Sequence, residues 1–222
     1  MNFDKNLFEK IAWDMPAMEI EQESFRRIEE EAVNMPEDPE EYRVARRLIH
    51  TTADFSIADN LVFNNHPAEA CVKALKAGAP LYSDSNMIKS GISVAKLHKF
   101  YPGYTRDSIH CYIADYEVAK VAKEKNISRA LASLDKARHI LNGSIVLTGN
   151  APLALAGIVR LYIEEHIKPA LIIGMPVGFV NVEESKELLA ATDIPHVMLA
   201  GRRGGSPLAV ATLHAMMESG LH

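Results

Sequence analysis

The stretch SIVLTGNAPLALAGIVRLYIEEHIKPALIIGMPVGFV, residues 144–180, holds two short apolar runs on either side of a helical pattern. The runs Ser144–Thr148 and Ala170–Gly174 have the length of buried strands, and Leu153–His166 has helical periodicity between them. A strand, a helix and a second strand in this order predict a right-handed crossover between two parallel strands. This stretch therefore predicts an α/β fold.

The same alternation extends to both sides of this stretch. Further strand-length runs are Ala79–Ser83, Ile109–Ala114 and His196–Ala200. Further helical patterns are Glu117–Lys125, Ser128–Leu141, Glu183–Ala191 and Leu208–Met217. Strands that alternate with helices of this length predict a mostly parallel central sheet with helices on both faces.

The first part of the chain is helical ahead of the first predicted strand. Helices are expected at Ile20–Met35 and Pro39–Thr52, with Asp38 as N-cap and Pro39 at the first helical position. A third helix is expected from His66-Pro67 to near Gly78. Because no linker rich in Gly, Ser or Pro separates these helices from the rest, residues 1–222 are expected to form one domain.

Composition excludes several classes of protein. The net charge is −5 and no Lys/Arg-rich block occurs, so nucleic acid is not an expected partner. The N-terminal residues contain acids and no continuous apolar run, which argues against a signal peptide, and no apolar stretch is long enough to span a membrane. The two cysteines, Cys71 and Cys111, lack CxxC spacing and suit a reducing cytoplasm.

Three glycine- and proline-rich loops follow predicted strands: Thr148–Pro152, Gly174–Val180 and Gly201–Ser206. In a parallel sheet these loops meet at the carboxyl edge, where ligands bind. Ser206 and Pro207 are expected as N-cap and first residue of the last helix, whose free amides favour an anion. Each loop could also be no more than a turn, but three at one edge favour a ligand cleft.

The standard signatures of several kinds of active site are missing. Neither GxGxxG nor GxxxxGK[ST] follows a strand, which argues against a nucleotide site. The nine histidines show no HExxH, HxxxH or Cys/His zinc spacing, so no metal site is expected. GxSxG is absent, which argues against a Ser-His-Asp hydrolase.

His50 stands on the polar side of its predicted helix. At about 100° per residue, Val44, Ala45, Leu48, Ile49 and Thr52 form the apolar stripe. His50 points away from the stripe, beside three arginines and Asp54. This face is either a solvated surface or a surface that binds anions, since arginine holds carboxylates bidentately.

Motifs along most of the chain carry a family resemblance. They are SFRRIEEE (Ser24–Glu31), RLIH (Arg47–His50), AGAP (Ala77–Pro80), GNAP (Gly149–Pro152), PVGFV (Pro176–Val180), ESK (Glu184–Lys186) and GRRGGS (Gly201–Ser206), with Asp84, Met87 and Gly91. In this order they resemble the precorrin-8X (cobalt-precorrin-8) methylmutases of the corrin pathway. The resemblance covers nearly everything after residue 20.

The resemblance implies a three-layer α/β/α sandwich and a homodimer whose active site lies at the subunit interface. It implies an isomerase that moves a methyl group between adjacent ring carbons without an external cofactor. The product is hydrogenobyrinate from the metal-free substrate, or cobyrinate from the cobalt form. His50 is the implied proton donor and acceptor. The implied substrate contacts are Ser24, Arg47, Ser93, Arg129 and Asn150.

A macrocycle edged with carboxylates needs cations at its rim, and six arginines are candidates: Arg43, Arg46, Arg47, Arg129, Arg202 and Arg203. Three positions depart from the family pattern. Ser93 and Ser128 replace the usual threonine, and Leu153 replaces the threonine that follows GNAP and so removes a hydroxyl. The alternatives are a non-catalytic tetrapyrrole carrier and a nucleotide-dependent α/β enzyme, and the missing phosphate loops count against the second.

Overall fold

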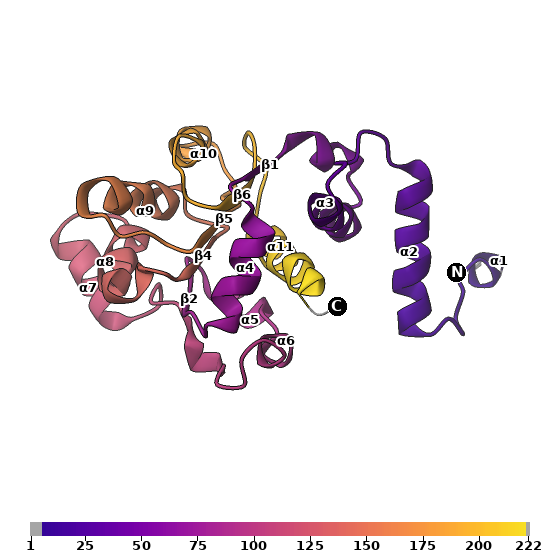
Figure 1. The fold of residues 1–222 in the computed structure, drawn as a ribbon, viewed down its shortest axis with the longest axis horizontal. Helices are drawn as coiled ribbons and strands as arrows, with labels where there is room; N and C mark the ends of the chain where they lie inside the picture. Colours follow the sequence, from indigo (N-terminus) through magenta and orange to yellow (C-terminus); the bar gives the residue numbers. More distant parts are fainter. Residues whose placement is uncertain (1–5, 221–222) are drawn as a thin grey trace, which may run out of the picture.

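The predicted apolar runs pair into one six-stranded sheet in the computed structural model, which describes residues 6–220. The strands lie in the order β1-β6-β5-β4-β2-β3 (Figure 1). Their bounds are β1 Leu61–Asn64, β2 Leu81–Ser83, β3 Ile109–His110, β4 Ile145–Thr148, β5 Leu171–Gly174 and β6 His196–Leu199. Strands β2 to β6 pair in parallel, as predicted.

Strand β1 was not predicted. It pairs antiparallel with β6, with Leu61 opposite Leu199 and Asn64 opposite His196. Its residues are all partly buried, so the segment shows neither a long apolar run nor the alternation of a one-sided strand.

Strand β3 is shorter than predicted, because it ends at His110 rather than at Ala114. The chain leaves the sheet after His110 and turns, with the Asp115 N–H donating to the Tyr112 carbonyl at 3.0 Å. An apolar residue beyond the strand packs against a helix instead of pairing in the sheet. The Tyr112 ring packs beneath helix α7 (Tyr116–Glu124).

Helices cover both faces of the sheet. In β4, Ile145 and Leu147 belong to one core cluster and Val146 to the other, so the strand alternates between two buried faces. One face carries α4 (Pro67–Lys76), α5 (Asn86–Gly91), α6 (Val94–His98) and α11 (Ser206–Ser219); the other carries α7, α8 (Arg129–Leu141), α9 (Pro152–Glu165) and α10 (Val182–Ala190) (Figure 1). The result is the predicted three-layer α/β/α sandwich. Helices α5 and α6 were missed because each is too short to show helical periodicity.

The N-terminal helices are stacked outward from α11. Helix α3 (Pro39–Thr52) packs between α11 and α2 (Ala17–Glu31), and α1 (Asn6–Glu9) lies beyond α2 (Figure 1). As predicted, Asp38 caps α3: its Oδ1 accepts from the N–H groups of Glu40 and Glu41 at 2.9 and 3.1 Å. The single domain over residues 1–222 stays a prediction, and residues 1–5 and 221–222 lie outside the described part. Every helix between residues 6 and 220 is too short or too polar to cross a membrane.

The apolar stripe of α3 is divided between two partners. Val44 and Leu48 join the main core against α11, whereas Ala45 and Ile49 pack towards Ile28 of α2. The prediction was correct for these four residues and wrong for Thr52, which is exposed and donates its hydroxyl to the Leu48 carbonyl at 2.8 Å.

A buried carboxylate joins the loop after β2 to the loop after β4. The Asp84 side chain is 1% exposed, and its Oδ2 accepts the N–H groups of Asn150 and Ala151 at 2.8 and 2.7 Å. The Gly149 N–H lies 3.1 Å from both Asp84 oxygens. Burial raises the pKa of the Asp84 carboxyl, and the three amide N–H groups oppose that rise because they favour the charged form.

The loop after β6 packs against the loop after β5. The Gly205 N–H donates to the Met175 carbonyl at 2.8 Å, and a Cβ on Gly204 would lie 2.3 Å from the same oxygen. The Lys186 ammonium donates to the carbonyls of Gly201 and Arg203 at 2.6 and 2.8 Å, and burial lowers its pKa to about 8. This loop conformation is therefore fixed by the Lys186 side chain and by a close backbone approach at Gly204 that only glycine allows.

Helix α11 begins at Ser206, one residue earlier than predicted. Gly205 is the N-cap, with φ 133° and ψ 156°, which L residues rarely adopt. The Ser206 hydroxyl instead lies 2.9 Å from that of Ser85 and connects this helix end to the loop after β2.

We expect Asp84→Asn to lower the free energy of unfolding by roughly 1–3 kcal/mol, because one carboxylate oxygen is replaced by an NH₂ group that cannot accept an amide hydrogen. Urea denaturation followed by circular dichroism measures the change. Asp59→Asn, at an exposed aspartate, is the control and should stay within about 0.5 kcal/mol of the unchanged protein. Equal stability of both variants would contradict this role for Asp84.

Candidate active site

His50 lies in the seam between α3 and α2. Its Nδ1 is 2.7 Å from the Ser24 hydroxyl, and the Phe25 ring meets the imidazole edge-on with centroids 5.3 Å apart. The Phe25 ring also lies under the guanidinium groups of Arg46 and Arg47, at 4.3 and 4.8 Å. His50 is thus half-buried under α2, so its side of α3 is not an open solvated surface.

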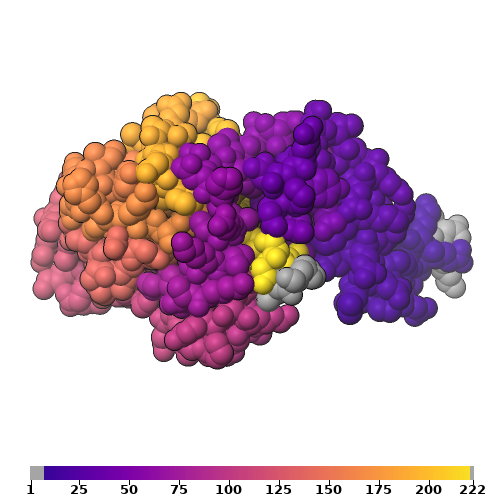
Figure 2. Space-filling view, viewed as in Figure 1, coloured from indigo at the N-terminus to yellow at the C-terminus, as the bar shows by residue number. Residues whose placement is uncertain are grey.

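Two hollows meet at His50. The first, which we call the His50 pocket, has a volume of about 400 Å³. Its walls come from α3, from α5 and α6, and from α11: Arg47, His50, Thr51, Met87, Gly91, Lys96, Ser206, Pro207, Val210, Ala211 and His214. The second, the α2–α3 hollow, has about 610 Å³ and is lined by Ser24, Ile20, Arg27 and His50 among others. The surface is indented where the N-terminal helices meet the rest of the chain, beside the yellow end of α11 (Figure 2).

Arg47 is the principal cation of the His50 pocket. Its guanidinium lies 2.5 Å from a Glu21 oxygen and 2.8 Å from a Glu218 oxygen, and Lys96 reaches the same Glu218 oxygen at 3.5 Å. The hydrogen bond from Arg47 holds the pKa of the Glu21 carboxyl below its usual range. Since both carboxylates are partly exposed, they can be replaced on Arg47 by the carboxylates of a ligand.

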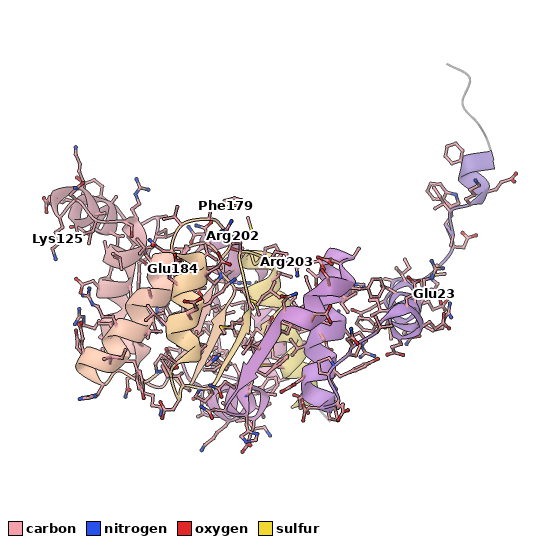
Figure 3. All side chains as sticks on the ribbon, turned by 90° about the horizontal axis from the view of Figure 1, so that it is seen from above. Glu23, Lys125, Phe179, Glu184, Arg202 and Arg203 are labelled. Atoms are coloured by element: carbon pink, nitrogen blue, oxygen red, sulfur yellow. The ribbon has the colours of Figure 1, made fainter. Side chains whose placement is uncertain are left out.

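Four of the other five predicted cations form ion pairs outside the His50 pocket. Arg43 pairs with Glu40 at 2.8 Å, and Arg46 pairs with Glu29. Arg203 pairs with Asp54, so it fixes the GRRGGS loop to the segment after α3. Figure 3 shows Arg202 and Arg203 on the same side of the molecule as Phe179, and Arg202 pairs with Glu183. Of the six arginines, only Arg47 lines the His50 pocket.

Two of the remaining predicted contacts border this region or its supporting loops. Ser93 is the N-cap of α6, where its hydroxyl accepts the Lys96 N–H at 3.3 Å, and its own N–H donates to His214 Nε2 at 3.2 Å. Asn150 is exposed on the loop held by Asp84 and is absent from the pocket wall. The structure thus brings Ser24 and Arg47 to His50 directly. Ser93 reaches the pocket only through His214, and Asn150 follows Gly149, which packs against Ser206 at the start of α11.

Arg129 is far from His50 within one chain. It lines a separate surface hollow of about 980 Å³ beside α7, together with Tyr116, Lys120, Asn126 and Ile127. In Figure 3, Lys125, which precedes α8, and Glu23 of α2 mark opposite ends of the molecule. One chain therefore does not bring Arg129 together with His50.

His214 on α11 lines the pocket but was not among the site residues predicted from the sequence. Burial, and then the charges of Lys96 and Arg47, lower the pKa of His214 to about 4, so the imidazole is neutral at pH 7. The sequence feature that could have identified His214 is a titratable side chain within the otherwise apolar sequence of α11. Among residues 6–220, no cluster of three or more His, Cys, Asp or Glu could hold a metal ion.

Comparisons with known proteins agree with this architecture. The family model of precorrin-8X methylmutase matches residues 19–219. A cobalt-precorrin-8 methylmutase of Leptospira interrogans is 43% identical over 89% of this chain and 91% of that protein. A precorrin-8X methylmutase of Pseudomonas aeruginosa is 37% identical over 89% and 93%. The crystal structure of a precorrin-8X methylmutase from Thermus thermophilus superposes with a TM-score of 0.82 at 40% identity, covering 92% and 97% of the two chains.

We expect His214 to make stability depend on pH below neutrality. Its pKa is about 4 in the folded chain, against an ordinary value of 6.5, so between these values the unfolded chain binds a proton that the folded chain does not. Its contribution to the free energy of unfolding therefore falls as pH drops from about 6.5 to 4. In His214→Gln this contribution is absent. Urea denaturation at several pH values should show the unchanged protein losing stability relative to His214→Gln as the pH falls from about 6.5 to 4, and parallel curves would contradict the assignment.

Proposed function

Because the chain belongs to the precorrin-8X methylmutase family, we propose that it acts on precorrin-8X or cobalt-precorrin-8 through His50. The chain is an isomerase of cobalamin biosynthesis. The proposed reaction breaks the bond from a methyl group to one ring carbon and forms a bond from the same methyl group to the adjacent ring carbon, which gives hydrogenobyrinate or cobyrinate. The observation that carries this proposal is the imidazole of His50, which is fixed by Ser24 at the meeting point of two hollows.

His50 can exchange a proton through its second ring nitrogen. Its Nδ1 is engaged with Ser24, and Nε2 has no hydrogen-bond partner in the part of the chain that the structure describes. A proton placed by His50 on a ring nitrogen would favour the rearranged π-system after migration, and the imidazole would then take the proton back. Ser24 is in this account a positioning residue, because it touches the imidazole that touches the substrate.

The pocket suits the edge of a macrocycle with acidic side chains. Arg47 and Lys96 supply positive charge on one side, and Met87, Val210 and Ala211 supply apolar surface for the ring. Glu21 and Glu218 hold Arg47 in place in the free enzyme. On binding, carboxylates of the substrate would take their place on the guanidinium.

A two-fold dimer would complete the site. Trp13, Met18 (76% exposed) and Ile20 expose apolar surface around the α2–α3 hollow, and Tyr116 (79% exposed) and Ile127 do so around Arg129. Exposed apolar patches of this kind are typical of interfaces. We propose that the first patch of each subunit contacts the second patch of its partner, which would bring the Arg129 side chain of one subunit to the His50 pocket of the other.

A cytoplasmic location belongs to the same proposal. Cys71 and Cys111 are both free thiols, and Cys71 is fully buried. Unpaired cysteines in a folded core are compatible with a reducing compartment.

We expect His50→Ala to lower the single-turnover rate with precorrin-8X by roughly 10²–10⁴-fold, because a general acid–base group is removed. The visible spectrum follows conversion to hydrogenobyrinate. Product affinity and the circular dichroism spectrum should stay close to those of the unchanged enzyme, since the carboxylate contacts and the core remain.

His139→Ala, at an exposed histidine of α8, is the matched control and should convert substrate at the normal rate. A folded His50→Ala enzyme that is equally fast would remove His50 from the mechanism. An unchanged enzyme that binds substrate in excess but never turns over would instead indicate a carrier.

We expect Arg129→Ala to weaken product binding roughly 10–100-fold, as for a lost charge-assisted contact, while the melting temperature stays unchanged. Arg160→Ala, at an exposed arginine of α9, is the control and should bind normally.

If Arg129 acts across the interface, co-expression of His50→Ala with Arg129→Ala should yield mixed dimers with one intact site each. At low substrate these recover about one quarter of normal activity, since about half of the dimers are mixed. Activity no higher than that of the separate variants would contradict the shared site.

A further inference from the structure

His214 lines the His50 pocket, and one of its two ring nitrogens is engaged by the protein. Its Nε2 lies 3.2 Å from the backbone N of Ser93, and a backbone N–H can only donate. Nε2 must therefore be the acceptor, which leaves the proton of the neutral imidazole on Nδ1. The tautomer of His214 is thus fixed by the main chain of Ser93.

The Nδ1–H of His214 has no acceptor within residues 6–220, and His214 forms part of the pocket wall. An N–H group that lines a pocket and lacks an internal partner is free to donate to an acceptor on a ligand. Its charged surroundings favour the same ligand chemistry. Arg47 and Lys96 are the nearest cations and Glu218 joins them, while His50 contributes a second imidazole to the wall.

We propose that the His214 Nδ1–H binds a carboxylate oxygen of the macrocycle's side chains, together with Arg47 and Lys96, at the α11 wall of the pocket. This inference rests on the proposed function of the site. The two histidines then have different roles: His50 exchanges protons, whereas His214 remains neutral and acts as a fixed hydrogen-bond donor. A neutral donor beside two cations adds direction to the binding of a carboxylate without adding a further positive charge to the pocket.

Two substitutions separate binding of the ligand from support of the fold. The amide of a glutamine reaches the place of Nε2, so His214→Gln can still accept from Ser93 but has no donor at Nδ1. The amide of an asparagine reaches the place of Nδ1, so His214→Asn keeps the donor and loses the contact with Ser93. Each variant therefore removes one of the two hydrogen bonds.

Titration of each dimer with hydrogenobyrinate, alongside its melting temperature, tests the proposal. We expect His214→Gln to melt like the unchanged enzyme and to bind roughly 10–100-fold more weakly, the range for a lost hydrogen bond to a charged group. We expect His214→Asn to bind within about threefold of normal despite a lower melting temperature. At saturating substrate, the single-turnover rate of His214→Gln should stay within a few-fold, because the proton route through His50 is intact.

Normal affinity of His214→Gln would overturn the proposal. So would a loss of affinity that follows the loss of melting temperature in both variants, since His214 would then only support Ser93. The unchanged enzyme tests the proposed function separately: if it binds no hydrogenobyrinate, the function assigned to the pocket fails, whatever the variants do.

Discussion

Helix α3 has to bury two adjacent faces against two different partners, and the place of the candidate active site follows from that constraint. Val44 and Leu48 fill the main core beside α11, whereas Ala45 and Ile49 need a second cover, which α2 provides. With both faces covered, the next side chain around the helix, His50, lies in the seam between α3 and α2 rather than in open solvent. The histidine is therefore held by the same contact that attaches the N-terminal helices.

The carboxyl edge of the sheet supplies the opposite side of the site, and its geometry depends on buried polar contacts rather than on apolar packing. Asp84 fixes the GNAP loop by accepting three backbone N–H groups, and Lys186 fixes the GRRGGS loop through two carbonyls. Such contacts impose one loop conformation because each unpaired partner would be costly when buried. The α11 wall of the pocket begins at Ser206, directly after these loops.

Much of the fold could be predicted from the sequence because its strands are continuous apolar runs separated by helical periods. β4 and β5 appeared almost at their true bounds for this reason. β1 was not predicted because a partly buried edge strand of four residues has no such pattern.

The residues of the candidate site were harder to predict from the sequence than the strands. The contact of Ser24 with His50 joins two helices 26 residues apart in sequence, and it came from resemblance rather than from periodicity. His214 was not predicted because, from sequence alone, a histidine in an apolar helix cannot be distinguished from a core residue. Arg129 and His50 line separate hollows of one chain, and the periodicity of their helices does not show how far apart those helices lie in the fold.

The most direct test of this account is the crystal structure of the enzyme with its corrin product. The proposed site predicts a two-fold dimer with the macrocycle in the His50 pocket, and a ring nitrogen about 2.6–3.2 Å from His50 Nε2. It also predicts a side-chain carboxylate on Arg47, and Arg129 of the neighbouring subunit on the same ligand. A macrocycle that lies elsewhere, or that turns its ring nitrogens away from His50 with Arg129 of both subunits remote, would contradict it.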